Sequence, residues 1–324
     1  MNLKQLKFFC AVVDCGFNMW SAASALHTSQ PSISRHIQAL EDELEVAIFR
    51  RGRKRINGLT RPGAEALKVA RRMLQDSENL HQLGRDFSAQ DSGRLVITTS
   101  HTHARYALPK VIEKFTSNYP KVHVSILQGH PVQITQWLTN GDADISISSN
   151  PSWPVPSLAM LPCYEYPIVI LACPGHPLLT HRPVSIVALV KYPLITYNSE
   201  FSIHRKVMRA FELRNLEPNI VLSATEVDVM KTYVKQGMGV AIVSAPGYDP
   251  KGDRHLNAID AKHLFGSTPI CLGVRKFSYL RSYTFHFISL FSPALSRDMV
   301  TRAIFDHADL PRRKQERAVP TVRS

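Results

Sequence analysis

Residues 20–44 read WSAASALHTSQPSISRHIQALEDEL and predict two short helices joined by a turn. The alanine-rich residues 21–26 predict the first helix, and residues 27–29 predict the turn. Gln30 then opens a second helix that runs to about Leu44. This spacing is typical of a helix-turn-helix, in which the second helix enters the major groove of DNA.

The second helix has one apolar and one polar side. Its apolar residues recur about every 3.6 positions and are expected in the core: Ile33, Ile37, Leu40 and Leu44. The polar side carries short hydrogen-bonding side chains and one cation, which suit base edges. We expect DNA contacts here from Thr28, Ser29, Gln30, Ser32, Ser34, Arg35 and Gln38. The alternative is a helical hairpin with a merely solvated polar face, in which Ser29 and Pro31 are ordinary helix-start residues.

A strongly basic segment follows and favours DNA binding over the solvated hairpin. Five cations without a compensating acid surround Gly52, and they are Arg50, Arg51, Arg53, Lys54 and Arg55. On a two-stranded wing, these side chains would contact phosphates. Such contacts supply salt-sensitive affinity, while the second helix supplies sequence discrimination.

The first 63 residues resemble the winged head of a LysR-type transcriptional regulator. The resemblance rests on residues 6–9, 21–23, 28–34, 40–44, 48–51 and 60–63. It implies a bacterial regulator that binds double-stranded promoter DNA and carries an effector-binding domain behind the head. The same resemblance is compatible with RNA polymerase as a partner.

Length and composition agree with a DNA-binding protein of several parts. The 324 residues are 44% apolar, and the net charge of +13 favours a polyanionic partner. No apolar run approaches membrane-spanning length, and the first residues predict an amphipathic helix rather than a secretory signal, so we expect a cytoplasmic protein without a membrane partner. The five cysteines are scattered and are expected to be buried thiols; a redox sensor would need a pair brought together by folding.

The pattern divides the chain into four parts. Residues 1–60 form the winged head, 61–90 a linker helix, 91–308 an effector-binding domain, and 309–324 a basic, disordered tail whose alternative role is nonspecific DNA affinity. The linker carries an apolar stripe at Val69, Met73, Leu80, Leu83 and Phe87. Packing on a second chain would give a homodimer or homotetramer, and packing on its own domain is the competing reading. The LysR resemblance favours the partner chain.

Behind the linker, strands alternate with helices, which predicts an α/β fold with a mostly parallel sheet. Strands are expected at residues 95–99, 122–127, 145–148, 168–172, 194–197, 220–224, 239–243 and 270–274, and helices at 106–118, 132–140, 203–214, 227–236 and 279–291. We expect two lobes that enclose a hinged cleft and resemble periplasmic binding proteins. Lobe I would comprise residues 91–165 and 266–308, and lobe II residues 166–265.

Loops that directly follow strands are where open α/β sheets bind ligands. Ser100, Thr102 and His103 follow the first strand and precede a helix, whose start favours an oxyanion. Ser149 follows the third strand, and Ser202 precedes another helix. Neutral donors can hold sulfate, a sulfonate or a carboxylate without a buried unpaired cation. Each Ser or Thr alone is more often a plain helix cap.

Residues 98–109 resemble the CysB branch of the LysR-type family, as do residues 128–129, 161–164, 192–194, 224–229, 231–234 and 277–283. That branch regulates sulfur assimilation and binds sulfate or acetylated serine derivatives. The resemblance therefore implies a sequence-specific regulator of sulfur assimilation or organosulfur utilisation genes. It assigns effector contacts to Ser100, Thr102, His103, Ser149, Tyr166, Ser202 and Thr225.

Some effector positions depart from the branch. The branch more often has Thr at Ser100, Ser149 and Ser202, Gln at His103, and Trp at Tyr166. Donors persist, but pocket volume and pH response change. The alternative is therefore a LysR-type regulator of another pathway that senses a different small carboxylate.

Other classes of function lack their motifs. We find no nucleophile elbow, zinc-protease motif, phosphate loop or dinucleotide fingerprint, which disfavours an enzyme. His101 and His103 could bind a metal, but no third ligand is evident, and we expect no resident metal or cofactor. An exported solute-binding protein would carry a signal and no basic wing. The two predicted effector-binding lobes disfavour a protein that only coats the chromosome nonspecifically.

Overall fold

The computed structural model describes residues 1–52, 56–88, 92–149, 151, 153–180 and 183–305. It divides into two units, the first made of Met1–Ser88 with Phe277–Tyr279, and the second of Ala89–Lys276 with Leu280–Ser324. The predicted DNA contacts Arg53, Lys54 and Arg55, and the predicted tail at residues 309–324, lie outside the described residues. Among the described residues, no helix combines the length and apolar character needed to cross a membrane.

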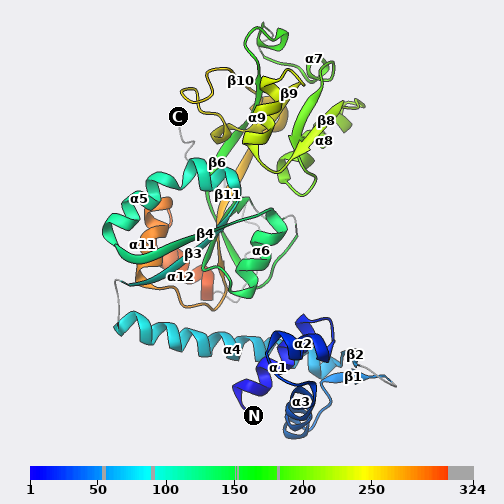
Figure 1. The fold of residues 1–324 in the computed structure, drawn as a ribbon, viewed down its shortest axis with the longest axis vertical. Helices are drawn as coiled ribbons and strands as arrows, with labels where there is room; N and C mark the ends of the chain where they lie inside the picture. Colours follow the sequence, from blue (N-terminus) through cyan, green and yellow to red (C-terminus); the bar gives the residue numbers. More distant parts are fainter. Residues whose placement is uncertain (53–55, 89–91, 150, 152, 181–182, 306–324) are drawn as a thin grey trace. The chain divides into compact units, whose positions relative to one another are not determined.

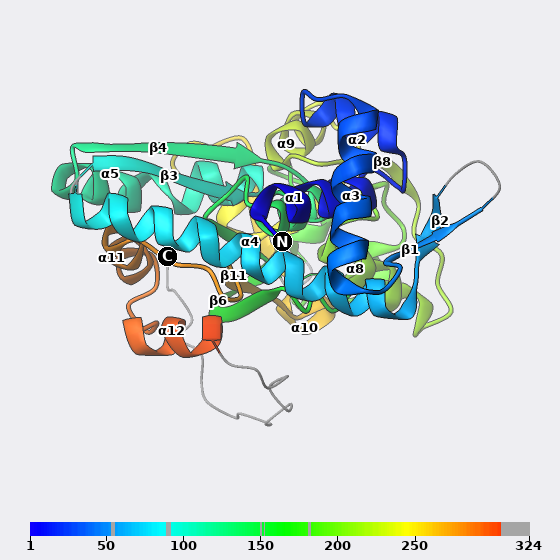
Figure 2. The ribbon, with the colours of Figure 1, turned by 90° about the horizontal axis from the view of Figure 1, so that it is seen from below.

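The first unit begins with a winged helix-turn-helix. Its elements are α1 (Leu3–Asp14), α2 (Met19–Ala25), α3 (Gln30–Leu44), β1 (Phe49–Arg51), β2 (Ile56–Leu59) and α4 (Arg61–Ser88). Figures 1 and 2 show α1, α2, α3 and the hairpin gathered at one end of α4. We call the elements from α1 to β2 the head and the β1–β2 hairpin the wing. The predicted helix-turn-helix and wing strands are confirmed.

Local chemistry explains the two short helices of the head. The side chain of Asn18 accepts hydrogen bonds from the backbone N–H groups of Trp20 and Ser21, and that of Ser29 accepts one from Ser32, so each helix has an N-terminal cap. Three of the four apolar residues predicted in the α3 core are buried. Leu44 is 37% exposed, because α3 ends there and Glu45 turns the chain with a φ of 55°.

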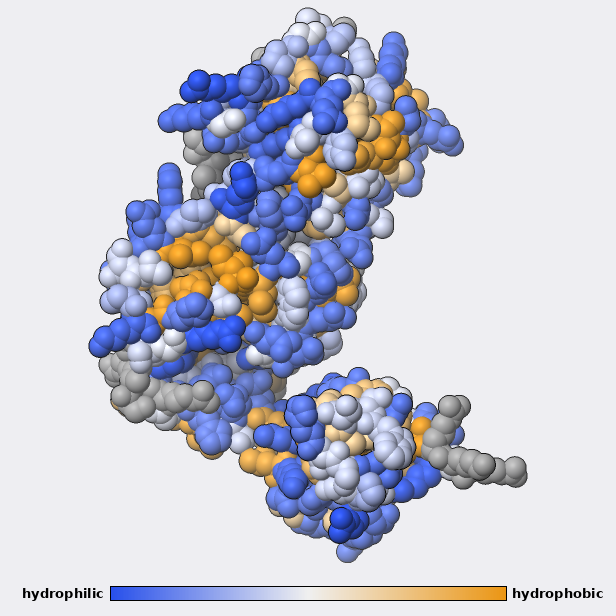
Figure 3. Space-filling view, viewed as in Figure 1, coloured by the Kyte–Doolittle hydropathy of each residue, from blue (hydrophilic) through white to orange (hydrophobic). Residues whose placement is uncertain are grey.

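Hydrophilic residues cover most of the visible face of the head (Figure 3). The linker prediction is confirmed as the single helix α4, which has 28 residues. Its apolar stripe is exposed, with Val69, Leu80 and Phe87 at 58%, 70% and 76%.

The second unit is built on one nine-stranded sheet in the order β4-β3-β5-β11-β6-β9-β7-β8, with β10 paired to β6. Its strands are β3 (Ser92–Thr99), β4 (Lys121–Gln128), β5 (Ile145–Ser149), β6 (Leu158–Ala172), β7 (Leu194–Tyr197), β8 (Ile220–Ala224), β9 (Val240–Ser244), β10 (Asn257–Asp260) and β11 (Ser267–Arg275). Its α-helices are α5 (Pro109–Asn118), α6 (Pro131–Asn140), α7 (Ile186–Leu189), α8 (Ser202–Glu212), α9 (Val227–Lys235), α10 (Lys262–Phe265), α11 (Ser282–Phe291) and α12 (Arg297–Phe305).

The prediction of a mostly parallel sheet was wrong. β3 is parallel to β4 and β5, and β7 is parallel to β8 and β9. The long strands β6 and β11 are antiparallel to each other, and β6 is also antiparallel to β9 and β11 to β5. The sheet is mixed because these two strands pass between the lobes and return the chain, as Figure 1 shows.

Each lobe has its own hydrophobic core, and β6 contributes to both. Ala159 and Cys163 of β6 pack in the first lobe with β3, β5, α5 and α11. Ile168 and Ile170 pack in the second lobe with β7, β9, α8 and α9. The predicted two-lobed α/β domain is therefore confirmed, and the carboxyl ends of β3, β5, β7 and β9 supply residues to one cavity, which is described below.

Candidate DNA interface and effector site

The polar side of α3 lies as the sequence predicted. Ser29, Arg35 and Gln38 are exposed, whereas Thr28, Gln30, Ser32 and Ser34 are half-buried. Three of these side chains have partners within the head, including Ser29, which caps α3 as described above. Gln38 donates from Nε2 to Asp42 Oδ1 at 2.8 Å, and Gln30 donates from Nε2 to Met19 Sδ at 3.5 Å.

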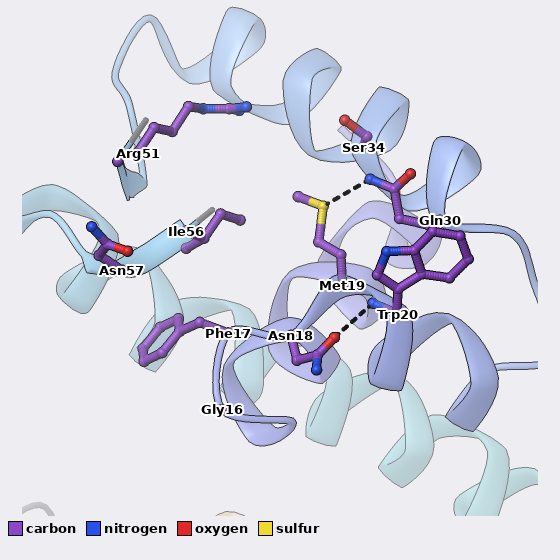
Figure 4. Close-up of a pocket in the computed structure, with 11 residues that line it drawn as sticks. Gly16, Phe17, Asn18, Met19, Trp20, Gln30, Ser34, Arg51, Ile56 and Asn57 are labelled. Atoms are coloured by element: carbon purple, nitrogen blue, oxygen red, sulfur yellow. Dashed lines mark hydrogen bonds between the residues drawn. The ribbon is translucent and has the colours of Figure 1, made fainter. Parts of the chain in front are cut away.

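A hollow of about 940 Å³ opens between the helix pair and the wing (Figure 4). It is lined by Gly16, Phe17, Asn18, Met19, Trp20, Gln30, Ser34, Arg51, Gly52, Ile56 and Asn57. The hollow thus brings together three predicted DNA contacts, Gln30, Ser34 and Arg51. Sequence reasoning missed Trp20 and Asn57, although both are polar-tipped side chains close to the predicted contacts.

Glu41 ties the wing to α3. Its buried carboxylate accepts hydrogen bonds from the backbone N–H groups of Ile48 at 2.9 Å and Phe49 at 3.1 Å, and from Arg51 Nη2 at 2.6 Å. The Arg51 guanidinium is therefore partly engaged inside the head, which the sequence analysis did not foresee. Arg50, the neighbouring wing cation, is exposed.

The second unit holds a small cavity of about 50 Å³ between its lobes. Five predicted effector contacts line it: Ser100, Thr102, His103, Ser149 and Ser202. The lining residues that were not assigned as effector contacts from the sequence are Pro131, Ile134, Ser148, Tyr197, Phe201, Ile203, Ser244, Thr268 and Ile270. Ser148, Tyr197 and Ser244 stand at the ends of β5, β7 and β9, so the strand-end rule could have found them.

The π-helical turn His103–Ala107, which we call η1, shapes one wall of the cavity. π-Helical turns are rare in proteins, and those that occur are often found at functional sites. His103 at its start is buried, its Nδ1 lies 2.8 Å from Ser100 Oγ, and its ring stacks on Tyr166 with 6.2 Å between centroids. Burial lowers the pKa of His103 to about 4, so the ring is neutral at pH 7.

The remaining polar groups of the cavity are also neutral. Burial raises the pKa of Tyr197, which therefore keeps its phenolic proton. Ser202 donates to Ser149 across the cleft, with 3.4 Å between the two oxygens. Among the described residues, Thr268 Oγ1 has no hydrogen-bond partner although it is buried. The wall thus offers hydroxyl and imidazole groups to a polar ligand, and none of the described lining residues is a Lys or Arg.

Two predicted effector contacts do not line this cavity. Tyr166 lies behind His103 and contacts its ring. Thr225 is exposed after β8. Tyr166 can therefore influence a ligand through its neighbours His103 and Thr268, whereas Thr225 is absent from the lining of the cavity.

The residues that follow His103 join the two lobes. Tyr106 donates to Asp228 Oδ1 at 2.7 Å and accepts a hydrogen bond from Lys231 Nζ at 2.9 Å. Arg105 Nε lies 3.2 Å from Asp228 Oδ2, and Lys231 Nζ lies 2.7 Å from Asp253 Oδ2. We call these five residues the interlobe latch.

The latch keeps its charges despite partial burial. Although burial acts to raise it, the pKa of Asp228 is held below its usual range by the hydrogen bond from Tyr106 and the charges of Lys231 and Arg105. Burial acts to lower the pKa of Lys231, but its hydrogen bonds to Asp253 and Tyr106 raise it overall. Both groups are thus charged at neutral pH.

His101 lies beside the latch rather than in a metal site. Its Nε2 is 3.8 Å from Glu226 Oε2, and its Nδ1 is 3.9 Å from Asp228 Oδ2. In the part of the chain that the structure describes, no three His, Cys, Asp or Glu residues are grouped to hold a metal ion.

Both units of the chain match models of known protein families. Residues 3–64 match the bacterial regulatory helix-turn-helix proteins of the lysR family, and residues 88–296 match the LysR substrate binding domain. The chain belongs to the LysR family. It is accordingly a DNA-binding transcriptional regulator with a domain for a small-molecule effector, and not an enzyme.

Individual LysR relatives cover nearly the whole chain. The regulator CysB of Burkholderia cenocepacia is 42% identical over 95% of this chain and 99% of its own. SsuR of the same organism is 43% identical over 91% and 96%. The crystal structure of the cofactor-binding domain of the regulator Cbl superposes with a TM-score of 0.64 at 34% identity, covering 66% of this chain and 94% of that one.

Proposed function

We propose that this LysR regulator controls genes of sulfur assimilation or organosulfur utilisation in response to a small sulfur oxyanion. The proposal is supported by the similarity to CysB, SsuR and Cbl together with the chemistry of the interlobe cavity. The observation that carries it is the wall of neutral donors around a space of about 50 Å³.

The size of the cavity favours a compact ligand. One water molecule needs a cavity volume of roughly 10–15 Å³, so a cavity of about 50 Å³ holds only a few waters. Sulfate or the head of a small sulfonate fits that space. An acetylated serine derivative is longer, and its binding requires the Ser149–Ser202 contact across the cleft to open.

The donors suit an oxyanion with several acceptor oxygens. Hydroxyl groups converge from the residues just before η1, from β5 and from α8, and each hydroxyl can rotate its hydrogen toward the ligand. Hydrogen bonds to an ionised acceptor are stronger than those between neutral groups. A lone buried cation would be costly to desolvate in the empty state, and this lining avoids that cost.

On the DNA side, we infer that α3 reads bases and the wing contacts phosphates. Arg35 is exposed on the reading face and is the side chain best suited to a guanine edge. Arg50 and Arg51 are the exposed cations of the described wing, and Arg51 is also held by Glu41; Arg53, Lys54 and Arg55 follow in the sequence. The exposed stripe of α4 supports a homodimer that presents two heads to a two-fold site.

Calorimetry of the full chain tests the effector. Titration with sulfate, methanesulfonate, O-acetylserine and acetate should show binding of sulfate or methanesulfonate and little of acetate. Thr102→Ala should abolish that binding, because the side chain lines the cavity, whereas Thr116→Ala on an exposed face of α5 should not. Binding of acetate in preference to the sulfur oxyanions would instead support a regulator of carboxylate metabolism.

Footprinting tests the regulatory role. Promoter DNA from the native genome should be protected at defined sites, and sulfate or methanesulfonate should change the protected length or the cleavage pattern. Protection that is unaffected by every tested ligand would contradict an effector-controlled regulator.

A further inference from the structure

Trp20 is an unusual feature of the head, because a large aromatic side chain lies 75% exposed at the start of α2. It borders the hollow that also contains Gln30, Ser34 and Arg51. Figure 4 shows its indole beside the side chain of Gln30, at the rim of that hollow. An isolated exposed apolar residue needs no explanation, but one that shares a hollow with candidate DNA contacts does.

The backbone that carries Trp20 is firmly held. Asn18 Oδ1 accepts hydrogen bonds from the backbone N–H groups of Trp20 at 2.9 Å and Ser21 at 3.1 Å. Ala22 and Ala23, in the next turn, are buried in the core of the head. The indole therefore projects from a fixed position, and with only two rotatable side-chain bonds it loses little entropy when it contacts a partner.

The surroundings of Trp20 are suited to nucleic acid rather than to an apolar partner. The hollow is lined by Arg51 and by the amide-bearing Gln30 and Asn57, beside the apolar Phe17, Met19 and Ile56. The wing that forms its far side continues into Arg53, Lys54 and Arg55 in the sequence. This combination of cations, amides and apolar side chains, with one exposed indole, matches a polyanion that also carries apolar sugar and base surfaces.

We propose that Trp20 is a DNA-contacting residue that packs its ring on a deoxyribose and donates its indole N–H to the adjacent phosphate, at the edge of the groove entered by α3. A tryptophan N–H is a donor only, so a phosphate oxygen is a suitable partner. The contact is with the backbone because Trp20 lies on α2, and the first helix of a helix-turn-helix crosses the backbone while the second reads bases.

This position gives Trp20 a distinct role among the contacts of the head. An uncharged side chain releases no counterion, so its contribution to affinity does not depend on salt as that of an arginine does. A backbone contact also carries no sequence information by itself. Trp20 therefore strengthens binding to every duplex and fixes how far the head enters the groove.

Binding measurements test this role with the full-length protein. The probes are a duplex selected by the protein from a random library and a scrambled duplex of the same composition. Trp20→Ala should weaken binding to both by about tenfold, the effect of losing one well-packed aromatic contact. Trp20→Phe should recover part of the loss, since it keeps a ring but lacks the N–H. Trp153→Ala, at an exposed position in the second unit, is the matched control and should change neither.

Salt dependence separates Trp20 from the cations. The slope of log affinity against log salt should be the same for Trp20→Ala and the unmodified protein, whereas Arg50→Ala should reduce it by about one phosphate contact. A loss confined to the selected duplex would overturn the backbone assignment and place the ring on a base. Unchanged affinity for both duplexes would overturn the proposal altogether.

Fluorescence supplies a readout that a purely structural role would not change. The chain has three tryptophans, so Trp137→Phe combined with Trp153→Phe leaves Trp20 as the only one. Its emission should be quenched or shifted to shorter wavelength on addition of either duplex. A shift that instead follows protein concentration without DNA would show a protein contact at Trp20 and overturn the proposal.

Discussion

A buried histidine determines how the proposed effector site should respond to pH. His103 has no carboxylate facing it among the described lining residues, and burial holds its pKa near 4, which leaves the ring neutral at pH 7. An anion bound beside it would raise that pKa, so the complex holds more protons than the free protein. Affinity should therefore rise as pH falls through the raised pKa toward 4.

Calorimetry with sulfate between pH 8 and pH 5 measures this slope. His103→Gln should remove it while keeping a donor in the wall, because an amide does not titrate in this range. A flat profile for the unmodified protein would mean that the ring stays neutral when the anion binds. Equal slopes for both proteins would assign the proton to another group.

Arg35 and Arg50 should differ in what they contribute to DNA binding. Arg35→Ala on α3 should lower affinity for the selected duplex by roughly 1–3 kcal/mol and leave the scrambled duplex little changed, because base contacts carry discrimination. Arg50→Ala should weaken both duplexes to a similar degree. Filter binding at two salt concentrations distinguishes them, and a parallel loss on both duplexes for Arg35→Ala would contradict its role as a reading residue.

Glu41 should be important for the stability and geometry of the wing. Glu41→Ala leaves two buried backbone N–H groups without their carboxylate acceptor. Each unsatisfied buried group typically lowers the free energy of unfolding by about 1–3 kcal/mol. Thermal unfolding should therefore shift to lower temperature. Glu43→Ala, an exposed position on the same helix, is the control, and equal melting temperatures for the two variants would refute the role of Glu41.

At the level of elements, η1 links the cavity to the interlobe latch. His103 at its start lines the cavity, while Arg105 and Tyr106 contact Asp228 of α9. A ligand that orders the start of η1 therefore also favours the arrangement in which its end holds α9. We therefore infer that effector binding at the proposed site and lobe closure are coupled in one equilibrium.

Tyr106→Phe tests that coupling. Loss of the hydroxyl removes one hydrogen bond to Asp228 and one from Lys231, which should destabilise the closed lobes by about 1 kcal/mol and weaken effector affinity several-fold. Tyr248→Phe, which removes a hydrogen bond within the second lobe, is the control. Unchanged effector affinity in Tyr106→Phe would show that closure does not depend on the latch.

Elements with strong periodicity or capping were predicted well from the sequence. The helix α3 and the linker α4 follow from apolar spacing and helix-start residues, and β7 and β9 from short apolar runs. The length of β6 could not be predicted, because Pro162 and Pro167 interrupt its sequence and disfavour a continuous strand. The antiparallel direction of β6 and β11 was also missed, because the spacing of strands along the sequence does not show which strands cross between the lobes.

The candidate site was predicted only where one segment of chain carries it. Ser100, Thr102 and His103 follow a single strand and were found together, with Ser149 and Ser202 at related positions. Thr268 was missed, because its approach depends on how β11 pairs in the sheet. The latch was missed for the same reason, since it joins Tyr106 to residues more than a hundred positions away.

At the level of the whole molecule, α4 is the proposed site of dimer formation. Leu80→Glu places a charge in its exposed apolar stripe and should convert the protein to a monomer in sedimentation velocity experiments. DNA containing two half-sites should then lose cooperative binding, while single heads still bind weakly. His81→Glu, on the neighbouring exposed face, is the control. A Leu80→Glu protein that remains a dimer would place the interface elsewhere.

The neutral wall of the cavity has a consequence for how the two halves respond to their surroundings. Attraction between the head and DNA weakens steeply as ions accumulate, because binding releases condensed counterions. Hydrogen bonds to the proposed ligand, which the buried and half-buried hydroxyls would enclose, are screened much less by those ions. Osmotic stress that raises the internal potassium concentration would therefore lower promoter occupancy while the effector stays bound. The regulator would then occupy its promoters again, with the same effector bound, once the stress has passed.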